Sequence, residues 1–376
     1  METKKYRFDE VTINFDKKRI PLSSAQREKR QGTFRYYGAQ GVIDHVDDYI
    51  FDGTYLLIAE DGENLKSKKQ NIAQVVDGQF WVNNHAHIVQ GNEQCDTRFL
   101  CYLINSMDLS GYVTGSAQPK LSQANLNAVT LSLPTLAEQK RIVEYLYMLD
   151  QKIDVNRQIN DNLYAQAKAI FDNHFINIDA IPAGWRKGNL LDIANYLNGL
   201  AMQKFRPQGH EIGLPVLKIK ELRQGSCDDS SELCSLSIKP EYIIHNGDVI
   251  FSWSGSLLVD IWCGGTCGLN QHLFKVTSDV YDKWFYYLWT AHHLARFIAI
   301  AADKATTMGH IKREELAKAE VLIPCEEDYT SFNSIMQPIF ELIISNRIES
   351  RKLAALRDEL LPKLMTGEID VSDVQF

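Results

Sequence analysis

Residues 115–163 read GSAQPKLSQANLNAVTLSLPTLAEQKRIVEYLYMLDQKIDVNRQINDNL, and this stretch decides how the chain is organised. Moved forward by 190 positions without a gap, it aligns with residues 305–353. The aligned pairs of like residues are Leu121 and Ile311, Leu126 and Leu316, Pro134 and Pro324, Ile153 and Ile343, Asn156 and Asn346, Arg157 and Arg347, and Leu163 and Leu353. An ungapped register of this length is hard to obtain by chance, so we predict two copies of one structural plan.

The repeat continues upstream with small changes of offset, as expected where loops differ in length. Residues 82–85 lie over 269–272, and residues 49–62 lie over 242–255. Both copies contain β-like runs bounded by Gly and Asn turns, at 55–58, 128–133, 248–251 and 319–323. Helical periodicity is found at 97–105 and 284–301. We therefore predict two similar α+β domains, formed by residues 1–133 and 179–323.

Each domain is followed by a long helical segment, residues 134–178 and 324–376. The first begins at Thr135-Leu-Ala-Glu138, which has capping-box spacing. Beyond it, positions at alternating steps of 4 and 3 form a heptad seam in each segment. The seam residues are Ile142, Leu146, Leu149, Ile153, Asn156, Asn160, Leu163, Ala167 and Ile170, then Phe332, Met336, Ile339, Ile343, Asn346, Ser350, Leu353, Arg357 and Leu360. We predict that the two helices form an antiparallel coiled coil between the domains, with a pseudo-twofold repeat.

Both seams are apolar at their ends and polar in the middle, at Asn156, Asn160, Asn346 and Ser350. Polar seam residues cost stability but fix register, so these four are candidate register residues. The alternative is that each helix packs on its own domain while the asparagines face water. About 40 helical residues at about 1.5 Å each span roughly 60 Å, enough to hold two domains well apart.

Several classes of protein are excluded by what the sequence lacks. It contains no G-x-x-x-x-G-K-[ST] loop, no G-x-S-x-G element, no H-E-x-x-H motif and no Asn/Asp-Pro-Pro-aromatic element, so we expect neither catalysis nor a cofactor. The most apolar window, 285–302, is interrupted by His292, His293 and Arg296, and the N-terminus has no signal-peptide run. The seven cysteines are scattered. We expect a cytoplasmic protein without a membrane segment.

Two groups of residues could bind metal. Cys263 and Cys267 are three residues apart, with Cys227 and Cys234 upstream, but the first copy has no matching cysteines and zinc ribbons favour two intervening residues. The run from His85 to His87 could chelate at alternate strand positions, yet its counterpart is His272-Leu-Phe274. Zinc stays open for the cysteines, but free thiols and packing histidines are the simpler interpretation, and we predict no metal site.

Positive charge is concentrated in the two domains although the net charge is −8. Residues 17–35 carry seven basic residues and one acid, residues 66–69 add three lysines, and residues 183–223 carry seven basic residues and three acids. Such clusters are often only solvated surface. Two copies of a basic domain held apart by a rigid spacer, however, suit duplex DNA, which repeats every ~34 Å.

The chain resembles the specificity subunit of Type I restriction-modification systems over essentially its whole length. The residues that carry the resemblance are GSAQPKLSQANLNAVTLSLPTLAEQKRIVEYLYMLDQKID (115–154), ATTMGHIKREELAKAEVLIP (305–324), LRDELLPKLMTGEIDV (356–371), RYYGAQGVIDHVDDYIFDGTYLLIAEDG (35–62) and GWRKGNLLDIANYLNGL (184–200). The second junction departs from the pattern: Pro324-Cys-Glu-Glu-Asp-Tyr replaces the LAEQ element, and Met308-Gly-His310 replaces Gln118-Pro-Lys120.

The resemblance implies two target recognition domains that each read half of a split sequence in double-stranded DNA. It implies helices that act as a ruler and dock methyltransferase (M) subunits, expected to be two, and through them restriction (R) subunits. Adenine methylation, translocation and cleavage would belong to those partners. Candidate DNA-contacting residues are Arg35, Tyr36, Lys66, Lys68, Lys69, Gln118, Lys120, Lys204, Arg206, Ser254, Thr306, Thr307, His310 and Lys312.

Three alternatives differ from this interpretation. One is the specificity chain of a related system in which methyltransferase and nuclease are fused in one partner. A nuclease would need a duplicated cluster of carboxylates and lysine, which the sequence does not offer. A scaffold protein without a DNA role would show no salt-dependent DNA affinity.

Overall fold

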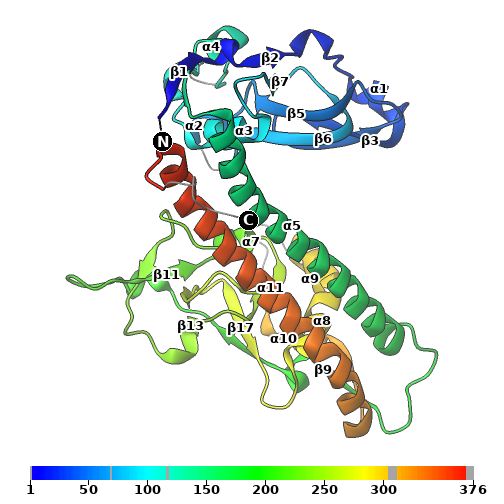
Figure 1. Cartoon of the computed structure of the whole chain (residues 1–376). Helices are drawn as coiled ribbons and strands as arrows, with labels where there is room; N and C mark the ends of the chain where they lie inside the picture. The colour runs from blue at the N-terminus through cyan, green and yellow to red at the C-terminus, as the bar shows by residue number, and fades with distance from the viewer. Residues whose placement is uncertain (1, 68–69, 116–117, 304–310, 370–376) are drawn as a thin grey trace. The chain divides into compact units, whose positions relative to one another are not determined.

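The computed structural model describes residues 2–67, 70–115, 118–303 and 311–369. They form two compact units: a first unit of Met1–Gln151 with Ala354–Phe376, and a second unit of Lys152–Leu353. Two long helices, α5 (Leu136–Phe171) and α11 (Glu326–Thr366), each contribute residues to both units (Figure 1).

The described part of the first unit contains a six-stranded sheet in the order β2-β7-β5-β6-β3-β4, in which β3 and β6 are parallel and the other neighbours antiparallel. The strands are β2 (Thr12–Asn14), β3 (Gln31–Gly38), β4 (Gly41–Val46), β5 (Phe51–Ala59), β6 (Ala73–Val82) and β7 (Ala86–Gly91). Helix α3 (Thr97–Ser106) packs on β5 and β6. Its N-terminus is capped by Asp96, whose carboxylate accepts hydrogen bonds from the N–H groups of Arg98 and Phe99.

The remaining elements of the first unit connect the sheet to helix α5. Strand β1 (Lys4–Arg7) pairs antiparallel with β8 (Thr130–Leu133), which directly precedes that helix. The short helices are α1 (Ser24–Glu28), α2 (Asn64–Ser67) and α4 (Gln123–Asn127), with helical turns at η1 (Phe8–Glu10), η2 (Asp16–Lys18) and η3 (Ser110–Tyr112). The predicted capping box is confirmed: Thr135 N–H donates to the Glu138 carboxylate over 2.9 Å, and Glu138 N–H to Thr135 Oγ1 over 3.4 Å.

The described part of the second unit has two four-stranded sheets, β10-β17-β14-β15 and β12-β11-β16-β13, in which β11 and β16 are parallel. The strands are β10 (Asn195–Asn198), β11 (Leu214–Leu217), β12 (Leu233–Cys234), β13 (Ile243–Ile244), β14 (Val249–Ser252), β15 (Leu258–Ile261), β16 (Cys267–Leu269) and β17 (Leu273–Thr277), with β9 (Arg186–Asn189) paired to β18 (Glu320–Ile323). The helices are α6 (Leu190–Ile193), α7 (Ile219–Gln224), α8 (Lys283–His292), α9 (Leu294–Asp303) and α10 (Arg313–Ala317), with helical turns at η4 (Asp172–Ile176), η5 (Met202–Lys204) and η6 (Pro240–Tyr242).

The two units share one strand plan, which confirms the internal repeat. The order β7-β5-β6 of the first unit returns as β17-β14-β15, and the order β6-β3-β4 returns as β16-β11-β12 with its parallel pair retained. The long strand β6 thus corresponds to two strands, β15 and β16, with residues 262–266 between them. At the junctions, α10, β18 and α11 begin 190 positions after α4, β8 and α5.

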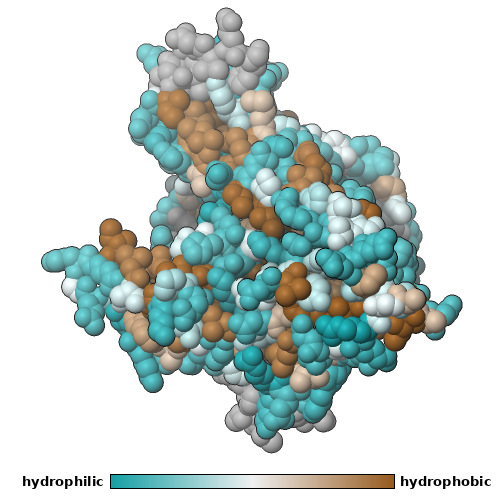
Figure 2. Space-filling view, turned by 90° about the horizontal axis from the view of Figure 1, so that it is seen from below, coloured by the Kyte–Doolittle hydropathy of each residue, from teal (hydrophilic) through white to brown (hydrophobic). Residues whose placement is uncertain are grey.

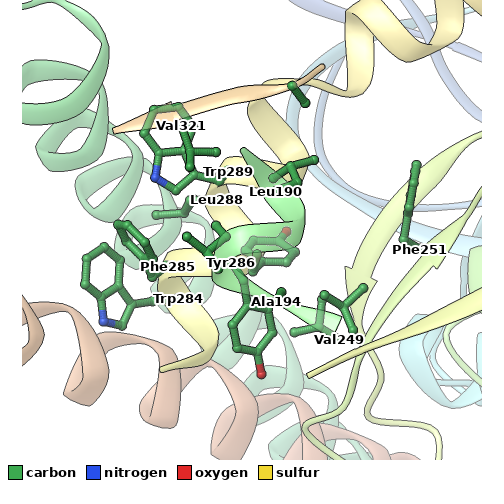
Figure 3. Close-up of a cluster of buried hydrophobic side chains, with 14 of the residues drawn as sticks. Leu190, Ala194, Val249, Phe251, Trp284, Phe285, Tyr286, Leu288, Trp289 and Val321 are labelled. Atoms are coloured by element: carbon green, nitrogen blue, oxygen red, sulfur yellow. The ribbon is translucent and has the colours of Figure 1, made fainter. Parts of the chain in front are cut away.

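An aromatic core fills the second unit around α8 (Figure 3). Trp284, Phe285 and Trp289 are buried there among strands and neighbouring helices. The helical periodicity found over 284–301 is confirmed, but it is divided between two helices, since α8 ends at His292 and α9 begins at Leu294. Between them, the His293 ring lies 2.8 Å from the carbonyl oxygen of Glu320, which anchors the bend outside the helix.

The helices α5 and α11 pair in antiparallel fashion along the predicted seam. Within the first unit, Asp150 contacts Arg357 over 2.7 Å. Within the second, Asn156 lies 3.3 Å from Ser350. Partner numbers fall on α11 as they rise on α5, so the helices are antiparallel. Asn156 is only 1% exposed, so the alternative in which the asparagines face water is wrong.

The described helices include none that is long and apolar enough to cross a membrane. On the face drawn in Figure 2, hydrophilic residues cover most of the surface and hydrophobic ones lie among them in separate groups.

Candidate nucleic-acid interface

Two chain segments that are far apart in sequence meet at one edge of the first unit. The first follows β5, and the second is the domain-to-helix junction at 113–121. The N–H of Leu121 donates to the Glu60 carbonyl over 2.8 Å, and the N–H of Gly62 donates to the Pro119 carbonyl over 3.2 Å. These main-chain bonds join the loop after β5 to the junction.

The loop and junction bring together three of the candidate DNA-contacting residues. Lys66 on α2 donates through Nζ to the Gly115 carbonyl over 2.9 Å, and Lys120 lies 3.2 Å from a Glu60 carboxylate oxygen. Gln118 is exposed beside them. Gly115 permits the junction turn, because its φ is +86° and a Cβ there would lie 2.2 Å from the Gln118 carbonyl oxygen.

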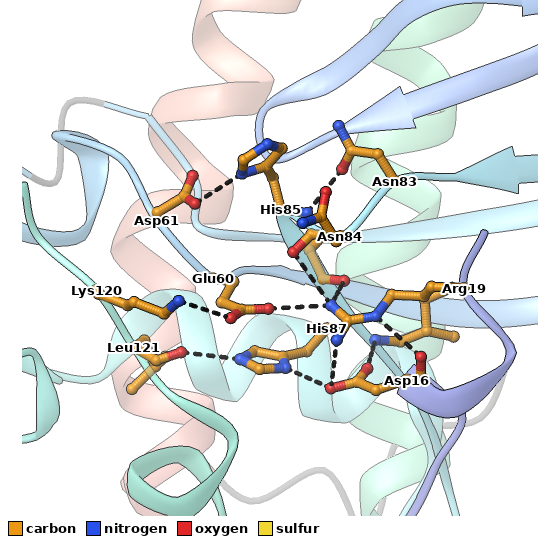
Figure 4. Close-up of polar contacts among 12 residues, drawn as sticks. Asp16, Arg19, Glu60, Asp61, Asn83, Asn84, His85, His87, Lys120 and Leu121 are labelled. Atoms are coloured by element: carbon orange, nitrogen blue, oxygen red, sulfur yellow. Dashed lines mark hydrogen bonds and ion pairs between the residues drawn. The ribbon is translucent and has the colours of Figure 1, made fainter. Parts of the chain in front are cut away.

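Behind this edge lies a buried ionic network, drawn in Figure 4. His87, on β7, is 1% exposed, with Nδ1 2.6 Å from Asp16 Oδ2 and Nε2 2.8 Å from the Leu121 carbonyl oxygen. Arg19 contacts Asp16 over 3.4 Å and Glu60 over 3.0 Å. The network therefore connects the segment after β2, strand β7 and the end of β5 to the junction.

The charges of this network stabilise one another. Burial opposes ionisation of Asp16 and Glu60, but hydrogen bonds from His87 to Asp16 and from Arg19 to Glu60 outweigh it, so the pKa of each carboxyl lies below its ordinary value. Burial likewise opposes protonation of His87, but its hydrogen bond to Asp16 raises the pKa of the ring above its ordinary value. His85 pairs with Asp61 over 2.7 Å at the exposed rim.

The second unit has the equivalent main-chain hydrogen bond at its junction, but apolar side chains stand where the first unit has the ionic network. Ile311, at the position equivalent to Leu121, donates its N–H to the Trp253 carbonyl over 3.0 Å. Phe274 takes the place of His87, since it pairs with Phe251 of β14 as His87 pairs with Ile58 of β5. The ring centroids of Trp253 and Phe274 lie 5.7 Å apart.

Several candidate residues lie outside the described ranges, namely Lys68, Lys69, Thr306, Thr307 and His310. Two others are buried, which corrects the expectation that they contact DNA from the surface. Tyr36 is 0% exposed, and its hydroxyl accepts a hydrogen bond from Leu22 N–H. Ser254 is 5% exposed, and its carbonyl accepts from the Ser252 hydroxyl.

The remaining candidates are exposed, at Arg35, Lys204, Arg206 and Lys312. Arg35, on β3, donates to the Asp77 carbonyl over 2.8 Å. Arg206 pairs with Glu232. Lys204, Arg206 and Lys312 belong to the second unit.

The basic clusters are more neutralised than their sequence suggested. Arg27 pairs with Asp44 over 2.8 Å, and Arg30 with Asp47 over 2.9 Å. The acids come from strand β4 and the segment after it, outside the basic stretch 17–35. A count of charges along the chain therefore overestimates the positive field of this surface.

The candidate register residues form two polar layers in the second unit. Asn156 donates through Nδ2 to Glu349 over 2.7 Å and to Ser350 over 3.3 Å. Four residues along α5, Asn160 accepts through Oδ1 from Asn346 Nδ2 over 3.0 Å.

All seven cysteines are described, and each is a free thiol. Burial raises the pKa of Cys95 and of Cys101 to about 12, so neither is a thiolate at neutral pH. The pKa of Cys227 lies below its ordinary value, chiefly through its interaction with the Cys267 thiol. Within the described ranges, no three His, Cys, Asp or Glu residues are arranged to hold a metal ion.

The network around His87 was missed by sequence reasoning, which treated the residue only as a possible metal ligand or packing group. The repeat held a signal that could have found its burial, because the alignment places His87 over Phe274. Its partner Asp16 is 71 residues away, and nothing in the sequence connects the two.

Comparison with known proteins agrees with this architecture. Residues 2–165 match the family model of the Type I restriction modification DNA specificity domain. The MjaIX specificity subunit of Methanocaldococcus jannaschii, a type I restriction enzyme subunit, is 27% identical over 307 residues, covering 74% of this chain and 70% of that protein. The HindI specificity subunit of Haemophilus influenzae is 20% identical, covering 85% and 84%.

The fold also matches a solved structure. The Type I restriction-modification S subunit from M. genitalium has a TM-score of 0.61 and 13% identity, covering 97% of this chain and 96% of that one. Over residues 2–165 the chain thus matches the Type I restriction modification DNA specificity domain, and over nearly its whole length its fold is similar to that of a Type I S subunit.

Proposed function

We propose that this chain binds a bipartite DNA sequence, with residues 1–133 reading one half and residues 179–323 reading the other. The observation that carries the proposal is the structural repeat. Both units have the same strand plan and the same main-chain bond at the domain-to-helix junction, and each junction leads into one helix of an antiparallel pair. Two equivalent binding surfaces on one spacer suit a target with two parts.

In this proposal the edge formed by Lys66, Gln118 and Lys120 contacts DNA in the first half-site. Lysine side chains contact phosphates and set the position of the protein on the duplex, whereas a glutamine can pair with the edge of an adenine. The loop and junction are joined through Glu60 and Gly62, so the three side chains would approach DNA together.

The helices α5 and α11 set the distance between half-sites and dock two methyltransferase subunits, through which restriction subunits join the complex. The chain itself catalyses no reaction. The partners would supply adenine methylation, translocation and cleavage. A related system with a fused methyltransferase and nuclease would use the same chain in the same way, and the composition of the purified complex distinguishes the two.

Domain exchange tests the proposal. Residues 179–323 are replaced by the equivalent domain of the M. jannaschii relative, and the modified DNA motif is mapped in cells that also carry the methyltransferase. One half of the motif should change while the other half stays. The reciprocal exchange of residues 1–133 is the matched control and should change the opposite half. The proposal that each domain reads its own half-site is contradicted if each exchange alters both halves of the motif, or if neither exchange alters any half.

A further inference from the structure

The surroundings of His87 determine its protonation. Both ring nitrogens face acceptors: Nδ1 lies 2.6 Å from Asp16 Oδ2 and Nε2 lies 2.8 Å from the Leu121 carbonyl oxygen. A carbonyl oxygen can only accept. Asp16 is held as a carboxylate, since its other oxygen accepts from Ile88 N–H over 2.8 Å and Arg19 lies 3.4 Å away. Both nitrogens must therefore carry hydrogen, which makes His87 an imidazolium cation.

Every element packed around the ring contributes to this charge balance. Asp16 and Arg19 come from the segment after β2, Glu60 from the end of β5, and Lys120 from the junction. Glu60 connects the buried charges to the exposed junction, because Arg19 and Lys120 contact different oxygens of its carboxylate. His85 pairs with Asp61 at the rim, where its side chain is 51% exposed.

We propose that His87, as an imidazolium, is a positioning residue that holds the domain-to-helix junction in the place where the first domain reads DNA. This inference rests on the proposed function. The charged ring donates to Leu121, and Lys120 and Gln118 precede Leu121 in the junction. Reading of the first half-site therefore requires a bound proton.

The direction of the pH effect follows from the two ring contacts. When the ring loses a proton, the remaining hydrogen stays on Nδ1, because the Asp16 carboxylate is the stronger acceptor. The Leu121 carbonyl then faces a lone pair and loses its donor. The folded pKa of His87 lies above the ordinary value of about 6.5. The contribution is thus complete below about pH 6.5 and is lost as the pH rises through the folded pKa.

The second domain serves as an internal control. In place of Glu60, His87 and Leu121 its described residues are Trp253, Phe274 and Ile311, which do not titrate, and the bond from Ile311 N–H to the Trp253 carbonyl is between main-chain groups. A titratable group nearby is His272, the counterpart of His85, whose ring centroid lies 6.2 Å from that of Trp253 and which, among the described residues, makes no contact of the His87 kind with the junction carbonyl. Reading of the second half-site should therefore not follow the protonation of a buried histidine.

The test uses the full-length chain and duplexes of its mapped target, each with one altered base pair in the first or the second half-site. Discrimination is the ratio of Kd for the altered duplex to Kd for the intact duplex, measured from pH 6 to pH 9. For the first half-site, discrimination should fall about tenfold as pH rises, as expected for loss of one charged hydrogen bond. For the second half-site it should stay constant.

Two variants locate the titrating group. His87→Gln keeps a donor but cannot titrate, and should make first half-site discrimination independent of pH. His85→Gln removes the exposed rim pair with Asp61 and should behave as the unmodified chain does. A pH dependence that disappears in His85→Gln and persists in His87→Gln overturns the inference, as does an equal fall at both half-sites.

A DNA-free measurement separates this inference from the proposed function. A nitrogen NMR titration of the unmodified chain should show that the His87 ring loses its second proton at a pH above the ordinary value of about 6.5. A ring that becomes neutral at or below about pH 6.5 overturns the inference by itself, whether or not the variants fold. Absence of sequence-specific DNA binding at every pH contradicts the proposed function instead, and the NMR spectrum still decides the state of the ring.

Discussion

Replacing Asn156 by leucine should stabilise the second unit, while the same change at Asn160 should destabilise it. Both asparagines lie on the α5 seam, four residues apart. Asn156 is 1% exposed and its Oδ1 atom has no hydrogen-bond partner among the described residues. Asn160 has partners on both atoms: Nδ2 donates to the Ile343 carbonyl over 3.2 Å, and Oδ1 accepts from Asn346 over 3.0 Å.

The magnitudes follow from these contacts. Asn156→Leu removes an unpaired buried oxygen, which costs about 1–3 kcal/mol, and buries an apolar side chain worth about 1.5–3 kcal/mol. The change also removes the hydrogen bonds from Asn156 to Ser350 and to Glu349, which together offset about 1–3 kcal/mol of this gain. Glu349 is exposed and keeps its ion pair with Lys152 over 3.3 Å. We expect a net gain of about 2 kcal/mol. At about 2–4 °C per kcal/mol, the unfolding midpoint should rise by about 4–8 °C.

Asn160→Leu leaves the Asn346 amide, 8% exposed, without its acceptor, at a cost of about 1–3 kcal/mol. Since position 160 is only partly buried, the leucine recovers less than this, and the midpoint should fall. The double variant Asn160→Leu with Asn346→Leu should recover it, because no unpaired amide remains. Differential scanning calorimetry of the three variants measures the midpoints. A fall for Asn156→Leu equal to that for Asn160→Leu would refute the reasoning.

Two further predictions concern the helix pair, one on the distance between half-sites and one on the contact of α11 with the second domain. Inserting four residues after Gln151 and four after Leu353 lengthens both helices by about 6 Å. The half-sites should then move apart by at most two base pairs of about 3.4 Å each. An unchanged spacer with full methylation would show that the helices do not set the distance between half-sites. Arg347→Ala removes a 2.8 Å ion pair between α11 and Asp260 of β15 and should lower the stability of the second unit by about 1 kcal/mol. Arg157→Ala at the equivalent place on α5 is the matched control and should change calorimetric stability by less than about 0.5 kcal/mol; equal losses would show that the pair with Asp260 is not what matters.

Features that depend on neighbouring residues could be predicted from the sequence. The capping box at Thr135 and Glu138 formed as expected because its two bonds join residues three apart. The heptad seam, including buried Ile142 and Asn156, follows from helix periodicity. The break at His293 was missed, because the group that anchors it, the Glu320 carbonyl, lies 27 residues away.

The candidate interface shows the same division. Lys66 and Gln118 were selected from separate stretches, and only the bonds between the loop after β5 and the junction reveal that they share an edge. Tyr36 was a candidate DNA contact beside basic residues, yet it is fully buried, because strand β3 directs it into the core. Residue type alone does not distinguish a binding side chain from a packed one.

The sequence by itself determined the duplication, the two long helices and the phase of their seam. Each of these depends on the spacing of residues along the chain, which the sequence contains directly. The tertiary structure decided which basic side chains are neutralised by acids, since Arg27 and Arg30 form ion pairs with Asp44 and Asp47 only in the folded chain. It also decided that His87 is a cation, because the acceptors on its two nitrogens come from Asp16 and Leu121, 71 and 34 residues away. Electrostatic environment depends on distance in space, and only the folded chain defines that distance.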